Sequence, residues 1–283
     1  MTSHQGKPKA CVIGYPVRHS RSPLIHGYWL DQLGIKGSYD RAEVAPDAFS
    51  SFMDNFVRLG YAGGNVTLPH KQTAFERCAG TTETAARLKA VNTLWVEAEK
   101  LYGDNTDAAG FLAALDEDAP GWDPGRTHAV ILGAGGAARA VAYALKLRGL
   151  KKIMLVNRTE ARADAIAADI GPPVESGEIV DVRHLLSGAA LFVNTTSLGM
   201  LGQPPLDIDL SPLPPDATVS DIIYVPAETE LIKTAKARGL RAAPGIGMLL
   251  HQAVPGFERW FGVRPRVTAE LRRLVEMDIL AAL

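Results

Sequence analysis

Short apolar segments that suit buried strands alternate along the chain with longer segments whose apolar residues recur at helical spacing. One stripe, Phe49, Phe52, Met53 and Phe56, is typical of a helix face that packs into a core. In the first part of the chain we predict strands at 10–13, 38–44 and 64–67, helices at 23–33, 46–59, 70–77 and 83–89, and a hairpin over 92–103.

The alternation becomes regular after a loop rich in Pro, Gly and Asp at 116–127. Strands that alternate with helices indicate an α/β fold with parallel sheets covered on both faces. We predict two α/β domains around a cleft, one from 1–105 plus 246–283 and one from 106–245, with the carboxyl ends of their strands facing the cleft. The further elements are strands at 128–132, 151–156, 191–194, 218–222 and near 241, and helices at 106–115, 137–148, 160–169, 228–238, 248–260 and 268–281.

The composition narrows the class of protein. Hydrophobic residues make up 47% and charged residues 22% of the 283 residues, which is normal for a globular protein and excludes a disordered chain. The formal net charge is −1 and no basic run occurs, so no nucleic-acid partner is expected. Cys11 and Cys78 lack metal-ligand spacing, and no metal site is predicted. The chain shows neither a signal peptide nor a membrane-spanning run, which predicts a cytoplasmic protein without membrane partners.

A glycine-rich turn follows the predicted strand 128–132 and opens the next predicted helix. Its G-x-G-x-x-A spacing suits a tight turn, a close backbone approach to pyrophosphate and close helix–strand packing. The helix N-terminus then offers unpaired N–H groups to phosphates. Glycines also serve plain turns, but the strand–turn–helix–strand context favours a Rossmann-type dinucleotide site. Its candidate residues are Gly133, Ala134, Gly135, Gly136 and Ala137, with Ala138 at the helix–strand contact.

The end of the second strand of this βαβ segment indicates which dinucleotide binds. NAD sites usually carry an acidic residue there, about 20 residues past the glycines, for the ribose 2′-hydroxyl. Here the strand is followed by Asn157-Arg158-Thr159, with Arg162 one turn into the next helix. Arginine pairs with a 2′-phosphate, which a carboxylate would repel. The sequence therefore predicts NADP, and the alternative is that both arginines are ordinary solvated charges.

Three polar clusters lie in the first predicted domain. In the first, Ser20 and Ser22 precede a helix, where they could cap it or hold a substrate carboxylate, and their spacing does not choose between these roles. The second cluster is Asn65-Val66-Thr67 with Lys71, and the third is Asn92-Thr93 with Asp104-Asn105-Thr106-Asp107. In the third cluster, Asp107 at a helix start could serve only to complement the helix dipole.

Taken in order, these motifs resemble the shikimate dehydrogenase family, and the resemblance covers nearly the whole chain. It implies an N-terminal substrate domain, a C-terminal Rossmann-type NADP domain, and the reversible NADP-dependent reduction of 3-dehydroshikimate to shikimate in chorismate and aromatic amino-acid biosynthesis. The matching segments are G-Y-P-V-R-H-S-R-S-P at 14–23, G-N-V-T-L-P-H-K at 64–71, A-V-N-T at 90–93, D-N-T-D at 104–107, G-A-G-G-A-A-R-A at 133–140, N-R-T at 157–159, N-T-T-S-L-G-M at 194–200, D-I-I-Y-V-P at 221–226 and G-I-G-M-L-L-H-Q at 245–252.

The resemblance also implies roles for individual residues. Lys71 and Asp107 match the family's catalytic pair, with Lys71 as general acid/base. The candidate substrate-binding residues are Ser20, Ser22, Asn65, Thr67, Lys71, Asn92, Asp107, Tyr224 and Gln252. Besides the glycine turn, the candidate NADP contacts are Asn157, Arg158, Thr159 and Arg162, and the positions that line the nicotinamide region are Thr195, Ile222, Gly245 and Met248.

The chemistry of ketone reduction suits this pair. Negative charge develops on the ketone oxygen, and a cation within hydrogen-bond reach stabilises and protonates it. Lys71 suits that role and Asp107 would orient it, although a carboxylate and burial shift a lysine pKa in opposite directions. Two alternatives stay open: a quinate/shikimate dehydrogenase with relaxed substrate or NAD use, and a non-catalytic nucleotide-binding protein of the same fold. The sequence is compatible with a monomer or a homodimer.

Overall fold

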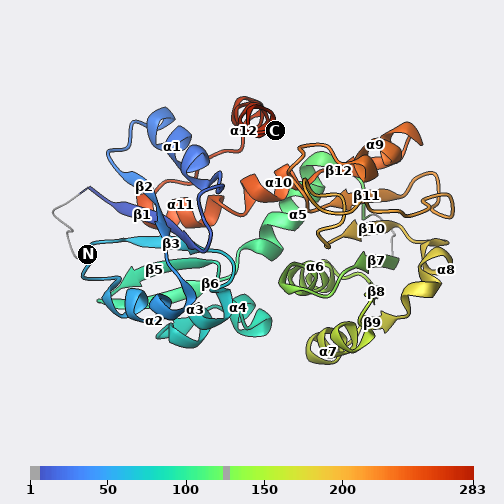
Figure 1. Cartoon of the computed structure of the whole chain (residues 1–283), viewed down its shortest axis with the longest axis horizontal. Helices are drawn as coiled ribbons and strands as arrows, with labels where there is room; N and C mark the ends of the chain where they lie inside the picture. Colours follow the sequence, from blue (N-terminus) through green and yellow to red (C-terminus); the bar gives the residue numbers. More distant parts are fainter. Residues whose placement is uncertain (1–6, 124–127) are drawn as a thin grey trace. The chain divides into compact units, whose positions relative to one another are not determined.

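The computed structural model describes residues 7–123 and 128–283, and the chain divides into two compact units (Figure 1). Unit 1 comprises the residues up to Thr106 together with Gln252–Val275, and unit 2 comprises Asp107–His251 with Glu276–Leu283. The end of the predicted loop 116–127 and the first six residues of the chain lie outside the described residues. Among the helices of the described ranges, none is both long enough and apolar enough to span a membrane.

Unit 1 is built on a six-stranded mixed sheet with the strand order β2-β1-β3-β5-β6-β4. β1 pairs in parallel with β2 and β3, whereas β5 is antiparallel to both β3 and β6. The sheet is therefore mixed, because the predicted hairpin joins the parallel strands as two antiparallel ones. The strands are β1 (Lys9–Gly14), β2 (Ser38–Glu43), β3 (Gly63–Val66), β4 (Gly80–Thr81), β5 (Thr93–Glu97) and β6 (Lys100–Asp104).

Helices cover both faces of the sheet of unit 1. Successive side chains of a strand point to opposite faces, so Ile13 packs into one core with Phe49 and Met53, and Val12 packs into another with Trp260. The predicted apolar stripe of α2 is thereby confirmed as core. The helices are α1 (Ser22–Gln32), α2 (Pro46–Asn55), α3 (Lys71–Arg77), α4 (Glu83–Leu88), α11 (Val254–Phe261) and α12 (Ala269–Ala281), which the division splits after Val275.

Unit 2 contains a six-stranded sheet in the order β12-β11-β10-β7-β8-β9, with every pair parallel. The chain builds outward from β7 through β8 to β9 and then resumes at β10 on the other side of β7, so the strand order reverses there. Ligands of such sheets bind outside the carboxyl ends of the strands at this reversal. The strands are β7 (His128–Leu132), β8 (Lys152–Val156), β9 (Val174–Gly177), β10 (Leu191–Asn194), β11 (Thr218–Asp221) and β12 (Arg241–Ala243).

Helices of unit 2 pack against its sheet and against one another. Leu186 and Leu231, from two of them, share a buried core with Phe192 and Val219 of the sheet. β4, β9 and α8 are not among the predicted elements, because two to five residues are too few to show a periodic pattern. The helices are α5 (Asp107–Asp118), α6 (Gly136–Leu147), α7 (Glu160–Ile170), a 3-10 turn (Ile179–Asp181), α8 (Val182–Leu186), α9 (Glu230–Ala237) and α10 (Gly245–His251).

The helix predicted over 248–260 is two helices, α10 and α11, so that prediction is wrong. Pro255 lies in the first turn of α11, where its missing N–H costs nothing, but it cannot continue a helix from α10. α10 packs against α5 within unit 2. The chain re-enters unit 1 after His251, and residues 276–283 group with unit 2.

Candidate active site

The carboxyl ends of β1 and β3 lie side by side in unit 1. Thr67 follows β3, and its N–H donates to the carbonyl oxygen of Ile13 at 2.9 Å. A Cβ on Gly14 would lie 2.4 Å from Thr67 Cγ2, so only glycine lets the two strand ends approach this closely. The end of β3 is thus held against the start of the loop that carries Ser20 and Ser22.

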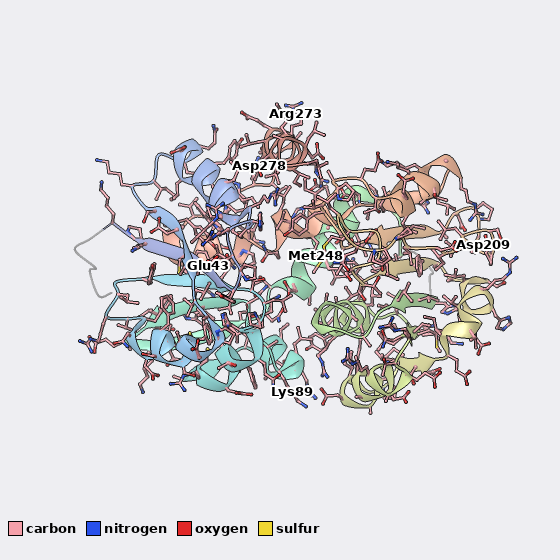
Figure 2. The ribbon with its side chains drawn as sticks, in the orientation of Figure 1. Glu43, Lys89, Asp209, Met248, Arg273 and Asp278 are labelled. Atoms are coloured by element: carbon pink, nitrogen blue, oxygen red, sulfur yellow. The ribbon has the colours of Figure 1, made fainter. Side chains whose placement is uncertain are left out.

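Two side chains from the end of β2 hold this serine loop. Arg41 donates to the carbonyl oxygen of Ser20 at 2.8 Å, and Glu43, labelled in Figure 2, accepts from the N–H of Val17 at 3.2 Å. Within the loop, the N–H of Ser22 donates to Ser20 Oγ at 3.3 Å. The N-cap residue of α1 is Arg21, whose side chain makes no capping hydrogen bond. Ser20 Oγ accepts from the first N–H of α1, so the two predicted roles of the serines do not exclude each other.

A buried hydrogen-bond chain begins on β2 and crosses β1 to β3. Tyr39 donates its hydroxyl hydrogen to Asn65 Oδ1 at 2.6 Å, and Asn65 Nδ2 donates to the carbonyl oxygen of Asn92 at 3.2 Å. Burial raises the pKa of Tyr39 well above its usual value, so the phenol stays a neutral donor. Tyr39 was not predicted from the sequence, because strand pairing determines its partner.

The side chain of Asn92 continues the network toward the end of β6. Asn92 Oδ1 accepts from Thr93 Oγ1 and from the N–H of Thr106, both at 2.9 Å. Thr106 Oγ1 donates in turn to the carbonyl oxygen of Gln252 at 2.8 Å, 146 positions away in the chain. Thr106 was not predicted as a site residue, although it lies within the D-N-T-D segment. It joins two predicted substrate residues, Asn92 and Gln252.

The candidate catalytic residues both stand at helix starts. Lys71 opens α3, and its carbonyl oxygen accepts from the N–H of Val91 at 2.8 Å, beside the segment that presents Asn92. Asp107 opens α5 and belongs to unit 2, but it directly follows Thr106 in the chain. Lys71 is linked to the hydrogen-bond network of unit 1 by its backbone bond to Val91, which precedes Asn92. Asp107 is linked to the network as the chain neighbour of Thr106. Tyr224, the remaining predicted substrate residue, follows β11 in unit 2 and is half-buried.

Two buried histidines near these residues serve packing. His26 is fully buried, its ring stacks 4.0 Å from that of Tyr39, and burial lowers its pKa to about 3, so it is neutral. His70 stacks 4.1 Å from Phe49, with Nε2 2.7 Å from the carbonyl oxygen of Val44. Over the described part of the chain, no three His, Cys, Asp or Glu side chains gather as a metal site would require.

The glycine turn of unit 2 is wedged between two strand ends. Gly133 has φ of 117°, a conformation that L side chains rarely adopt, and its N–H donates to the carbonyl oxygen of Val156 at 2.8 Å. A Cβ at Gly133 would lie 2.5 Å from Thr195 Oγ1. Thr195 itself donates through its N–H to the carbonyl oxygen of Leu132 at 2.8 Å. The turn thus lies at the strand-order reversal between β7 and β10.

Gly135 and Gly136, the next glycines of the turn, are not packed against other residues as Gly133 is. A Cβ on Gly135 or Gly136 would meet no protein atom within 4 Å, and both residues are exposed. Gly135 is the N-cap residue of α6, so the first N–H groups of that helix point toward this open space. Ala134 and Ala137 flank it half-buried, while Ala138 is fully buried. A helix N-terminus whose first N–H groups have no helical partner can bind a phosphate group.

The remaining predicted cofactor residues extend this site along the strand ends. Asn157 Nδ2 donates to the carbonyl oxygen of Thr159 at 2.8 Å, in a turn where Arg158 is exposed; Arg162 is exposed one turn later. On the other side, a Cβ on Gly245 would lie 2.4 Å from the carbonyl of Ile222. Met248, labelled in Figure 2, follows one turn later on α10 and is half-buried.

These residues lie in the order of the strands that carry them. From β8 through β7, β10 and β11 to β12, the row reads Arg158, Gly133, Thr195, Ile222 and Gly245. Backbone hydrogen bonds join neighbouring members of the row. For example, the N–H of Ile222 donates at 3.1 Å to the carbonyl oxygen of Asn194, which precedes Thr195. An extended dinucleotide would meet arginines at one end and an apolar segment at the other.

Comparisons with known proteins show which family the chain resembles. Three family models match the chain: the shikimate dehydrogenase substrate binding domain at residues 12–94, shikimate / quinate 5-dehydrogenase at 123–200, and the shikimate 5′-dehydrogenase C-terminal domain at 245–271. A shikimate dehydrogenase (NADP(+)) of Methylocella silvestris is 59% identical over 279 residues, 98% of each chain.

Solved structures give a similar result. Shikimate 5-dehydrogenase of Thermus thermophilus, in complex with NADP(H) and shikimate, is 34% identical with a TM-score of 0.83, over 98% of this chain and 100% of that one. A quinate dehydrogenase of Corynebacterium glutamicum, in complex with NAD, is 30% identical with a TM-score of 0.88, over 98% of this chain and 99% of the other.

Proposed function

The chain belongs to the shikimate dehydrogenase family, as its motifs predict, and we propose that it catalyses the reversible NADP-dependent reduction of 3-dehydroshikimate to shikimate. The observation that carries this proposal is the buried network from Tyr39 through Asn65 and Asn92 to Thr106, which gathers predicted substrate residues beside Lys71. The reaction would serve chorismate and aromatic amino-acid biosynthesis.

In this proposal Lys71 manages the proton. Bound NADPH supplies the hydride when the ketone is reduced. As the C3 oxygen gains negative charge, Lys71 donates a hydrogen bond and then a proton to it, and in the reverse direction Lys71 accepts the proton of the C3 hydroxyl. Asp107 binds a neighbouring hydroxyl and orients the ammonium group of Lys71. The start of α5 suits a carboxylate, because the helix dipole favours negative charge there.

Ser20 and Ser22 are assigned to the substrate carboxylate. The hold that Arg41 and Glu43 have on this loop from the side of β2 supports the assignment. Hydroxyl groups are good partners for a carboxylate, because each donates one hydrogen bond to an acceptor-only group. The substrate hydroxyls are assigned to Thr67, Asn65, Asn92, Tyr224 and Gln252.

The cofactor is assigned to the row along the strand ends of unit 2. The open space at Gly135 and Gly136 receives the pyrophosphate, and Arg158 and Arg162, with Asn157 and Thr159, receive the 2′-phosphate. The nicotinamide is assigned to Thr195, Ile222, Gly245 and Met248. A cytoplasmic location completes the proposal, and the two free thiols, Cys11 and Cys78, suit a reducing compartment.

A quinate dehydrogenase that uses NAD is the second candidate, favoured by the likeness to the Corynebacterium glutamicum enzyme. Initial rates with shikimate and with quinate, each against NADP⁺ and NAD⁺, separate the two. We expect the highest kcat/KM for shikimate with NADP⁺. A higher value for quinate with NAD⁺ would favour the second candidate, and no activity in any of the four assays would contradict both.

A further inference from the structure

A carboxylate without an assigned role is buried at the end of β11. Asp221 is 1% exposed, and it lies in the D-I-I-Y-V-P segment beside Ile222. Its Oδ1 accepts from Asn194 Nδ2 and from the N–H of Ile223, both at 3.1 Å, and its Oδ2 accepts from Thr229 Oγ1 at 2.7 Å. Burying a carboxylate is unfavourable unless hydrogen bonds compensate it, and here three donors do so.

The donors suit the ionised form of Asp221. Burial raises the pKa of Asp221, while the hydrogen bonds from Thr229, Ile223 and Asn194 lower it. Thr229 is the N-cap residue of α9, and its Oγ1 accepts from the N–H of Ile232 at 3.4 Å. Its O–H is therefore directed to Asp221, which as a carboxylate only accepts hydrogen bonds.

Asn194, the side-chain partner of Asp221 on β10, fixes the loop that follows that strand. Asn194 Oδ1 accepts from the N–H of Thr196 at 3.1 Å and from Thr196 Oγ1 at 2.7 Å, and Asn194 Nδ2 also donates to the carbonyl oxygen of Leu198 at 3.2 Å. Asp221 thus holds two turns at once: the one after β10, which contains Thr195, and the one after β11, which contains Ile222.

We propose that Asp221 is a positioning residue for the nicotinamide half of the cofactor, because its carboxylate sets the distance between Thr195 and Ile222. This inference rests on the proposed function, which assigns the nicotinamide to those two positions. The arginines assigned to the 2′-phosphate follow β8 and lie beyond β7 in the sheet, away from the bonds of Asp221. Removing a hydrogen bond of Asp221 should therefore weaken binding of the nicotinamide half and leave binding of the adenosine half unchanged.

Thr229→Val and Thr218→Val form a matched pair for the test. Both replace a buried threonine in unit 2 by an isostere, but Thr229 Oγ1 bonds Asp221, whereas Thr218 Oγ1, at the opposite end of β11, bonds to none of the residues that the structure describes. Binding of NADPH and of adenosine 2′,5′-bisphosphate, which contains only the adenosine end, is measured by titration calorimetry. Asp221→Asn, which removes the charge but keeps an acceptor oxygen, is measured in parallel.

Thr229→Val should weaken NADPH binding by up to about tenfold, because the binding loss cannot exceed the strength of the one hydrogen bond that is removed within the protein. Asp221→Asn should weaken it at least as much, and both variants should bind the bisphosphate within twofold of the wild type, as should Thr218→Val for both ligands. Unchanged NADPH binding in Thr229→Val, or an equal loss of both ligands, would overturn the proposal. If Asp221→Asn does not fold, Thr229→Val decides alone. Wild-type protein that binds neither ligand would contradict the proposed function instead.

Discussion

The two units place their candidate residues by different physical means. In unit 1, side-chain hydrogen bonds between buried polar groups, such as Asn92 to Thr106, set the positions. In unit 2, most positions are set by backbone hydrogen bonds between strand ends and by the close packing that Gly133 and Gly245 allow. The hydrogen bonds of Asp221 add a side-chain link between two of these strand ends. Unit 1 should therefore be sensitive to the loss of functional groups, and unit 2 to added side-chain volume.

The largest effect is expected from removing the functional group of Lys71. Lys71→Ala should lower kcat by about two orders of magnitude or more, the usual contribution of a general acid/base. Steady-state rates of shikimate oxidation measure this, with the exposed Lys36→Ala as the matched control. A kcat near that of the wild type would remove Lys71 from the mechanism.

Two glycine variants test whether added volume matters in unit 2. Gly133→Ala places a Cβ against Thr195 and strains a φ of 117°, so it should lower the free energy of unfolding by about 1–3 kcal/mol and abolish cofactor binding. Gly135→Ala has open space and an ordinary φ of −104°, so stability should stay unchanged while KM for NADP⁺ rises about tenfold. Urea denaturation and kinetics separate the two effects. Normal NADP⁺ kinetics in Gly135→Ala would show that the space does not hold the pyrophosphate.

Arg158→Ala tests which dinucleotide the row of unit 2 selects. The lost charge-assisted hydrogen bonds to the 2′-phosphate should raise KM for NADP⁺ about tenfold or more, because such bonds contribute about 1.5–3 kcal/mol each. KM for NAD⁺, which lacks that phosphate, should change less than twofold. Equal losses with both cofactors would mean that Arg158 does not recognise the 2′-phosphate.

The last effect concerns stability alone, which His26 makes dependent on pH. Its pKa is about 3 in the folded protein against 6.5 for an unperturbed histidine, so between these pH values the unfolded state binds more protons. Stability should therefore fall as the pH drops from about 6.5, by up to about 1.4 kcal/mol per pH unit. His26→Phe should show a shallower fall in urea midpoints measured at pH 7, 6 and 5. Parallel curves for the two proteins would contradict the buried neutral histidine.

Contiguous motifs made much of this molecule predictable from the sequence. The glycine turn, the Asn-Arg-Thr turn and Lys71 each lie in a short segment whose spacing carries its own meaning. The family followed from such segments. The order of the main elements followed from the spacing of apolar residues, apart from the short β4, β9 and α8 and the break before α11.

The residues that support the site were not predictable in this way. Tyr39 meets Asn65 across 26 positions, and Asn194 meets Asp221 across 27. Each contact depends on which strands pair and in which register, and a local sequence pattern predicts neither the pairing nor the register. The polar site residues could therefore be named before the structure, whereas the side chains that hold them could not.

The most direct test of the account is a crystal structure of the protein with shikimate and NADP⁺ bound. We predict Lys71 Nζ within about 3.2 Å of the C3 hydroxyl oxygen, which is the reach of a hydrogen bond, and the Arg158 guanidinium against the 2′-phosphate. A complex in which another group contacts the C3 oxygen, with Lys71 turned away from it, would contradict the central claim.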